Sequence, residues 1–307
     1  MERTVHTSEK GMRLERFLRI HFPRLPGAAQ LLKQGRLTVD GRKARALDPL
    51  APGQIVRIGE PAPPPRPAGE GAATGGEAPG PSPADRARLA AMIVHEDDDL
   101  LVLDKPAGLA VHAGTRTTDD LDRLLAGFVD AEGERPVLVH RLDKDTSGLL
   151  VAAKRRREAA RLGAAFAGRD VEKTYLAVVE GVLDPPRGTI AVPLRKIETP
   201  RGGRMVAAPD DPAALTAVTD WRVVEIREGG ASSLVALTPK TGRQHQLRAH
   251  MRECGHPILG DRLYGRAGSA PRLMLHALRL RLPATSGTDL RLETPWPAAF
   301  GPRTEGV

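Results

Sequence analysis

Cysteine, aromatic residues and long apolar runs are all scarce in this chain of 307 residues. The single cysteine, Cys254, excludes an internal disulfide and a metal site built from several thiolates. No apolar run approaches the roughly 18 residues that a membrane-spanning helix needs. The N-terminal residues also lack the apolar core of a secretory signal. Together these absences predict a cytoplasmic protein that does not enter a membrane.

Positive charge, by contrast, is in excess, with a formal net charge of +8. Residues 11–59 hold ten Lys or Arg against three acidic residues, so nearly the whole surplus lies in this segment. A solvated basic face would explain it, but such a concentration favours a surface that binds the phosphate backbone of a nucleic acid. The candidate RNA-binding residues there are Arg13, Arg16, Lys33, Arg36, Arg42 and Lys43.

Proline and glycine divide the chain into two domains. Apart from its prolines, segment 61–85 has no apolar side chain larger than Ala, so it cannot form a core and is typical of a flexible tether. Beyond it, many strand-like runs and few helical ones predict an α+β domain with a mostly antiparallel sheet. We expect a small α/β domain, a linker, a large domain and a tail, at residues 1–60, 61–88, 89–300 and 301–307.

Reactive side chains are concentrated in one stretch, residues 137–154, which reads VLVHRLDKDTSGLLVAAK. Two apolar runs of strand length enclose a polar turn that carries His140, Arg141, Asp143 and Asp145. A rigid scaffold that presents a loop with several such groups is a common arrangement for a functional site. The stretch therefore predicts a site in which Asp143 is the residue to explain.

Asp143 has three chemical interpretations. A calcium loop that began at Asp143 would need a glutamate at its twelfth position, where the chain has Lys154, so the EF-hand is excluded. The aspartyl turn of phosphatases of the haloacid-dehalogenase type is disfavoured, because Ser147 replaces threonine and no acidic pair follows a later strand. The third interpretation is a carboxylate that acts on a base or a sugar without a metal.

Four segments, taken in order, resemble the RluA-like family of RNA pseudouridine synthases. They are HRLDKDTSGLLVAAK, EKTYLAVVEG, TPKTGRQHQLRAHM and GHPILGDRLYG, which start at residues 140, 172, 238 and 255. Residues 11–59 are similar to the RNA-binding module named after small-subunit ribosomal protein four. The resemblance implies a pseudouridine synthase fold and an isomerase that acts on RNA with neither a cofactor nor a metal.

The same resemblance implies roles for five side chains. Asp143 would be the catalytic carboxylate, either as a nucleophile or as the base that removes a ribose proton. Arg243, at the start of a helix expected over 241–254 with a Thr241–Gln244 capping box, would be a cation close to Asp143. Tyr175 would stack on the target uracil, Leu247 would form an apolar wall, and Arg141 would fill the space that the base leaves. The alternatives are an exposed arginine at a helix end for Arg243 and core residues for Tyr175 and Leu247.

Uridine in large-subunit (23S) ribosomal RNA is the substrate that the resemblance implies, and transfer RNA is the closest alternative. A protein of a different class, a non-catalytic RNA-binding factor of ribosome assembly, is disfavoured by Asp143, because a pure binder has no use for a carboxylate that faces a polyanion. We further expect a monomer whose partner is RNA.

Overall fold

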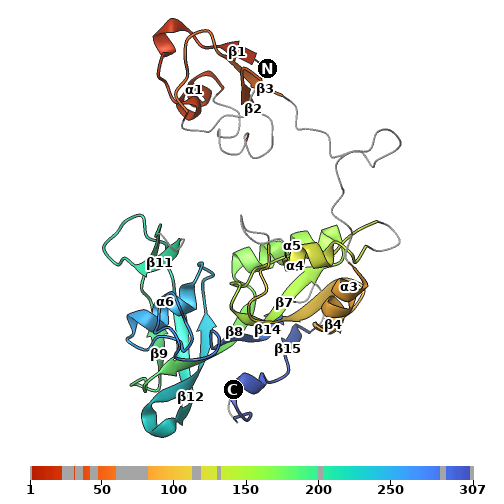
Figure 1. The fold of residues 1–307 in the computed structure, drawn as a ribbon, viewed down its shortest axis with the longest axis vertical. Helices are drawn as coiled ribbons and strands as arrows, with labels where there is room; N and C mark the ends of the chain where they lie inside the picture. The colour runs from red at the N-terminus through yellow and green to blue at the C-terminus, as the bar shows by residue number, and fades with distance from the viewer. Residues whose placement is uncertain are drawn as a thin grey trace. The chain divides into compact units, whose positions relative to one another are not determined.

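The computed structural model describes residues 2–22, 31, 37–41, 48–59, 82–112, 119–129, 133–199, 203–283 and 288–304. The chain forms two compact units, Met1–Gly76 and Glu77–Val307. Each unit has a sheet of its own, as Figure 1 shows, and a separate hydrophobic core.

The first unit contains a three-stranded antiparallel sheet in the order β1–β3–β2 and a helix. Its elements are β1 (Glu2–Thr4), the short helix η1 (Thr7–Glu9), α1 (Leu14–His21), β2 (Leu37–Val39) and β3 (Ile55–Ile58). Leu14, Phe17 and Leu18 of α1 are buried, as their helical spacing predicts.

Two of the predicted RNA-binding residues, Arg13 and Arg16, are exposed on this unit. The other four lie outside the described residues: Lys33, Arg36, Arg42 and Lys43.

The second unit is built on one ten-stranded sheet. The strand order is β4–β5–β7–β14–β8–β13–β12–β9, with β15 beside β14 and β6 beside β7. Neighbouring described strands are antiparallel except for β7 and β14. The α+β class with a mostly antiparallel sheet, predicted from the sequence, is therefore confirmed. The strands are β4 (Ile93–Glu96), β5 (Leu100–Lys105), β6 (Val137–Leu138), β7 (Ser147–Ala153), β8 (Glu172–Glu180), β9 (Arg187–Ile190), β12 (Thr219–Arg227), β13 (Ser232–Pro239), β14 (Leu275–Leu282) and β15 (Leu290–Glu293).

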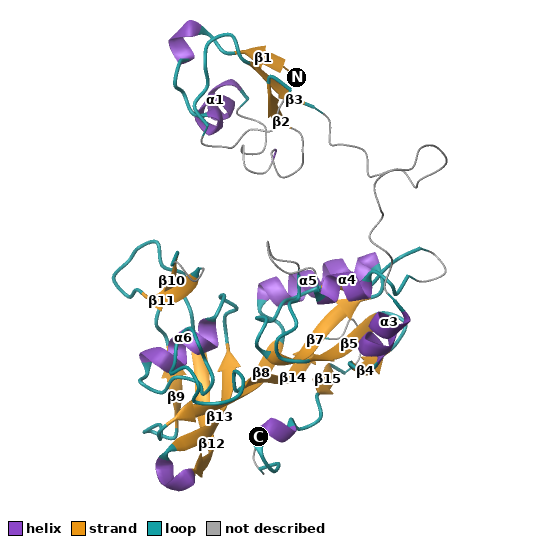
Figure 2. Ribbon diagram, in the orientation of Figure 1, coloured by secondary structure: helices purple, strands orange, loops and turns teal. Residues whose placement is uncertain are grey.

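Strand β7 lies at the centre of one half of this sheet, and all seven of its residues are buried. Helices α3 (Pro83–Ala90) and α4 (Leu121–Leu125) pack with Leu150 in one apolar cluster, whereas α5 (Arg156–Gly168) packs with Val151 in another. Because successive strand residues face opposite sides, helices cover both faces of this half of the sheet. Figure 2 shows α3, α4 and α5 next to this half. The rigid strand directly follows the turn that carries Asp143.

Helix α3 overlaps the segment 61–88 that composition predicts to be a linker. The Ser82 side chain accepts a hydrogen bond from the Asp85 backbone N–H, which caps the helix, and Leu89 is buried in the same cluster as Leu121. Arg123 of α4 also contacts both carboxylate oxygens of Asp85, at 3.1 and 3.0 Å. The second unit therefore includes residues before position 89.

The other half of the sheet carries α6 (Gln246–Glu253) and a small hairpin of β10 (Leu194–Ile197) and β11 (Arg204–Ala207). Helix α6 begins at Gln246, five residues later than the predicted start at Thr241. The prediction of a Thr241–Gln244 capping box is therefore wrong. His245, in the left-handed region with φ 50°, precedes the helix, and Thr241 donates to the Gln246 side chain instead. The apolar run before the turn that carries Asp143 is also shorter than expected, because β6 has only two residues.

Candidate active site

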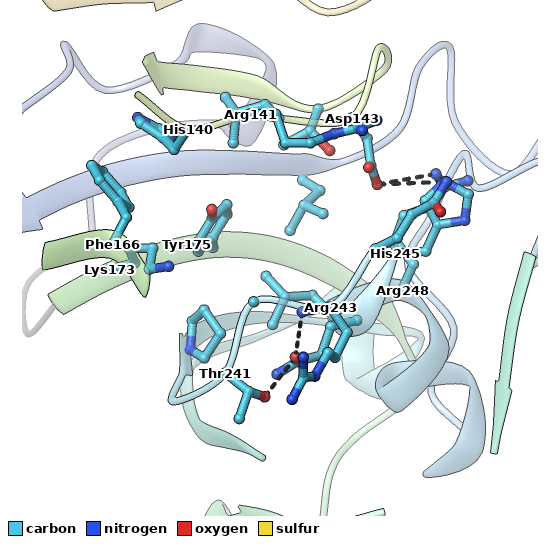
Figure 3. A pocket seen from close by; sticks show the side chains of 18 of the residues that line it. His140, Arg141, Asp143, Phe166, Lys173, Tyr175, Thr241, Arg243, His245 and Arg248 are labelled. Atoms are coloured by element: carbon cyan, nitrogen blue, oxygen red, sulfur yellow. Dashed lines mark hydrogen bonds and ion pairs between the residues drawn. The ribbon is translucent and has the colours of Figure 1, made fainter. Parts of the chain in front are cut away.

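A pocket of about 420 Å³ opens where three segments of the second unit meet. Its walls come mainly from the turn after β6, from α5 and β8, and from residues 239–248, which lead into α6 and include its first three residues. All five side chains to which the sequence assigned a role line it, as Figure 3 shows for those that it labels: Asp143, Arg141, Tyr175, Arg243 and Leu247.

The turn that carries Asp143 is held by short-range backbone contacts. The Thr146 backbone N–H donates to the Asp143 carbonyl at 3.1 Å, which closes the turn. The His140 ring accepts the Val151 backbone N–H through Nε2 at 3.0 Å. Burial lowers the pKa of His140 to about 3, so the ring is neutral and can accept this bond at neutral pH.

Gly148 joins this turn to the sheet at the point where β7 pairs with β14. A Cβ at this position would lie 2.2 Å from the carbonyl oxygen of Ala277, and its φ is 109°. Only glycine fits such a close approach of two backbones. The glycine that follows the polar turn is therefore required by the pairing of the parallel strands.

Lys105, a residue to which the sequence assigned no role, supports the turn from inside the protein. Its side chain is fully buried, and Nζ donates to the carbonyls of Pro106, Leu109 and Lys144 at 2.9, 2.9 and 3.0 Å. Burial lowers its pKa to about 8, although nearby carboxylates, among them Asp143, act in the opposite direction. The Lys144 carbonyl belongs to the residue after Asp143, so this ammonium group links the turn to the end of β5.

The arginine beside Asp143 is Arg248 and not Arg243. The Nη1 atom of Arg248 lies 3.4 Å from Oδ2 of Asp143. Arg243 lines the pocket, but its Nε donates to the carbonyl of Thr216 at 2.9 Å. The predicted segment does supply a cation next to the carboxylate, but this cation is Arg248 and the prediction of Arg243 is wrong. The reason is that α6 starts at Gln246 and turns Arg248 towards Asp143.

Arg248 is held in place by a second carboxylate, Asp261. Nε and Nη2 of the guanidinium group bind the two Asp261 oxygens at 2.7 and 2.8 Å. Oδ1 of Asp261 also accepts the backbone N–H groups of Leu263 and Tyr264. Burial by itself would lower the pKa of Arg248, but the bonds to Asp261 and the charges of both carboxylates raise it overall. The GHPILGDRLYG segment therefore supplies the support of this cation, a role that the sequence pattern did not reveal.

His245 is a second nitrogen donor or acceptor near the carboxylate. Its Nε2 lies 3.9 Å from Oδ2 of Asp143, and its Nδ1 lies 3.1 Å from the Tyr264 hydroxyl. That hydroxyl accepts the Met205 backbone N–H at 2.8 Å, so its own proton is available for Nδ1. Burial lowers the pKa of His245, while the charge of Asp143 acts to raise it.

Tyr175 and Leu247 serve both the core and the pocket. The Tyr175 ring packs against the apolar cluster that contains Leu150 and against a second apolar cluster built on β8, β13 and α6. Burial together with the Asp143 charge raises the pKa of Tyr175, so the phenol is neutral. Leu247 is 6% exposed and belongs to one of these clusters. Arg141 is exposed. Asp145 is also exposed and is not among the residues that line the pocket.

Within the described ranges, no group of three or more His, Cys, Asp or Glu side chains is arranged to hold a metal ion. In the same ranges, none of the helices is both long and apolar enough to span a bilayer.

Comparison with known families gives a match to the model of RNA pseudouridylate synthase over residues 99–253, a range that contains Asp143, Tyr175 and Arg248. An uncharacterised RNA pseudouridine synthase of Zymomonas mobilis is 38% identical over 69% of this chain and 96% of that protein. Ribosomal large subunit pseudouridine synthase C of Escherichia coli K12 is 33% identical over 95% of this chain and 91% of that protein.

Two human structures resemble the fold. Human RNA pseudouridylate synthase domain containing 4 superposes with a TM-score of 0.58 at 32% identity, over 70% of this chain and 92% of that one. Human RNA pseudouridylate synthase domain containing 1 gives 0.57 at 31% identity, over 67% and 83%.

Proposed function

This chain belongs to the RNA pseudouridylate synthase family, and we propose that it converts uridine to pseudouridine in large-subunit ribosomal RNA. The catalytic part of the proposal rests on one observation: Asp143 lies in a pocket with its carboxylate beside Arg248. The ribosomal substrate is supported by similarity to the E. coli large-subunit enzyme, which extends over 95% of this chain.

We assign the chemical step to Asp143. Isomerisation breaks the bond between C1′ of the ribose and N1 of uracil and forms a bond between C1′ and C5, while C5 loses a proton and N1 gains one. One carboxylate can promote this, either by attack as a nucleophile or by removal of a ribose proton. Arg248 fixes the position of the carboxylate, since Asp261 holds the guanidinium group at two nitrogen atoms. The residues in this reaction scheme use no cofactor and no metal.

The other pocket residues would recognise the base. A uridine must leave its stack to reach Asp143, which costs a few kcal/mol. The ring of Tyr175 offers an aromatic surface for uracil, and Leu247 offers an apolar wall. Arg141 would enter the RNA where the base has left, and its support is its exposure two residues before Asp143. Arg243, which also lines the pocket, would contact the RNA rather than Asp143.

The first unit is proposed to be an RNA-binding module of the type named after small-subunit ribosomal protein four. Its support is the resemblance of residues 11–59 together with the concentration of basic residues there, of which Arg13 and Arg16 are exposed. An RNA-modifying role also supports a cytoplasmic location. We propose that the protein acts as a monomer.

The test is conversion of defined RNAs by the purified full-length chain. We expect pseudouridine at specific positions of a large-subunit rRNA transcript, none in a mixed tRNA transcript pool, and an unchanged rate in the presence of EDTA. Conversion of tRNA alone would favour the tRNA alternative. Binding of rRNA without any conversion would favour an assembly factor, and a rate that EDTA abolishes would contradict the metal-free scheme.

A further inference from the structure

Lys173 lies in the same pocket, at the end away from Asp143. It is the second residue of β8, and Tyr175 is the fourth, so both side chains emerge on one face of the strand. Both line the pocket. In Figure 3 the Tyr175 ring lies between the Lys173 side chain and the Asp143 turn.

An aromatic ring and a glycine lie beside the Lys173 ammonium group. Nζ lies 5.5 Å from the centroid of the Phe166 ring, and that ring stacks on His140 with 4.3 Å between centroids and an interplanar angle of 17°. On another side is Gly242, where a Cβ would lie 3.9 Å from Nζ. The cation is thus held by a ring face and by backbone that carries no side chain.

No carboxylate balances this cation in the described part of the chain. Lys173 takes part in none of the ion pairs found there, and burial lowers its pKa with no acidic neighbour to oppose the change. Among the described residues that line the pocket, Asp143 is the single acid, and it lies beside Arg248. Burying a charge without a partner is costly, so an anionic ligand at this position would offset that cost.

We infer that Lys173 binds a phosphodiester group next to the target uridine. The inference rests on the proposed function, since it takes the ligand of the pocket to be a nucleotide of RNA. Every nucleotide within a strand carries a phosphate on each side, and lysine is a common phosphate ligand. The Asp143 carboxylate repels a phosphate, whereas Lys173 attracts one. This separation of charge favours a direction of the RNA strand in which one phosphate lies towards Lys173 and away from Asp143.

The direct test replaces Lys173 by Gln in the full-length protein. The probe is a short synthetic RNA centred on a uridine that the wild-type protein converts. Loss of one phosphate contact should weaken binding about 5-fold to 10-fold and should make the slope of log affinity against log salt shallower by about 0.7. The single-turnover rate at saturating protein should fall less than the affinity does. Lys173→Arg keeps the charge and should restore the wild-type salt slope.

A matched control is Lys154→Gln, because the Lys154 ammonium group already pairs with Glu96 at 2.9 Å. This variant should keep the wild-type slope, which separates loss of one phosphate contact from a general change in protein charge. An equal change of slope in Lys154→Gln and Lys173→Gln would overturn the inference.

A second set of probes identifies the phosphate. Each RNA carries one neutral methylphosphonate linkage, either 5′ or 3′ of the target uridine. One of the two should weaken wild-type binding and have no further effect on Lys173→Gln. Suppose that the wild-type protein forms pseudouridine. The inference about Lys173 alone is then overturned if each methylphosphonate weakens binding of Lys173→Gln as much as it weakens binding of the wild type, or if Lys173→Gln keeps the wild-type salt slope. A wild-type protein that forms no pseudouridine overturns the proposed function and this inference with it.

Discussion

The two ends of the pocket differ in how their charges are matched. At the Asp143 end, the carboxylate lies 3.4 Å from Arg248, and Arg248 in turn is bound by Asp261. At the Lys173 end, a cation is held over the ring of Phe166 and has no carboxylate partner within the described ranges. At the Asp143 end the protein itself supplies the opposite charge before any ligand binds. At the Lys173 end an anionic ligand would supply it.

This difference separates two tasks. A catalytic carboxylate needs a fixed position, and a network of ion pairs supplies it before the substrate binds. A binding residue gains most when its charge is compensated only in the complex, because the uncompensated cation favours binding of an anion. Variants at the two ends should therefore alter different quantities.

Asp143→Asn should have the largest effect on turnover. Replacement of the carboxylate by an amide removes both the nucleophile and the base, so pseudouridine formation should fall by at least about a thousand-fold. RNA affinity should stay the same or rise slightly, because a negative charge that faces RNA is lost, and the salt slope should stay that of the wild type. The rate is measured at saturating RNA, and appreciable residual turnover would refute the catalytic role of Asp143.

Arg248→Met tests how strongly the Asp143 end is held together. The Arg248 side chain is 8% exposed, and that of Asp261 is fully buried, so the variant leaves a buried carboxylate without its partner. Such a change costs about 3–5 kcal/mol of the free energy of unfolding. Urea denaturation measures it.

Arg243→Met is the matched control for that measurement. It removes a guanidinium group that binds one carbonyl oxygen, that of Thr216. The expected loss is about 1 kcal/mol. Equal losses in the two variants would contradict the assignment of Arg248 as the structural cation of the site.

Lys105→Met tests the fully buried lysine that supports the Asp143 turn, through the pH dependence of the free energy of unfolding. The pKa of Lys105 is about 8 in the folded protein against an ordinary value of 10.5. Between these values the unfolded chain binds more protons, so the stability that Lys105 contributes rises with pH in this window. The wild-type free energy of unfolding, relative to Lys105→Met, should therefore increase by up to about 3 kcal/mol from pH 8 to pH 10.5. A difference that is flat or falls with pH would rule out this account of Lys105.

Much of the architecture follows from local pattern. The apolar run that follows the Asp143 turn predicted β7, and the many strand-like runs beyond the linker predicted the mostly antiparallel sheet. These elements follow from sequence because the periods of helices and strands are set by backbone geometry alone. The motifs also placed Asp143, Tyr175, Arg243 and Leu247 around one pocket.

The pairings inside that pocket depended on the tertiary structure. Arg243 and Arg248 lie five residues apart in one motif, and the start of α6 at Gln246 decided which of them meets Asp143. The buried Gln246 side chain accepts from the Arg243 backbone N–H and sets that start, a bond that a capping-box pattern does not predict.

Contacts between distant segments form the other part that sequence could not reveal. Lys105 reaches the Lys144 carbonyl across 39 positions, and Arg248 reaches Asp143 across 105. The sequence by itself determined which reactive side chains are available and where helix and strand periods occur, because both are local properties of the chain. Which charge meets which is decided by the packing of β5, β7 and α6, since hydrogen bonds and ion pairs depend on distances of a few ångströms that only the folded backbone sets.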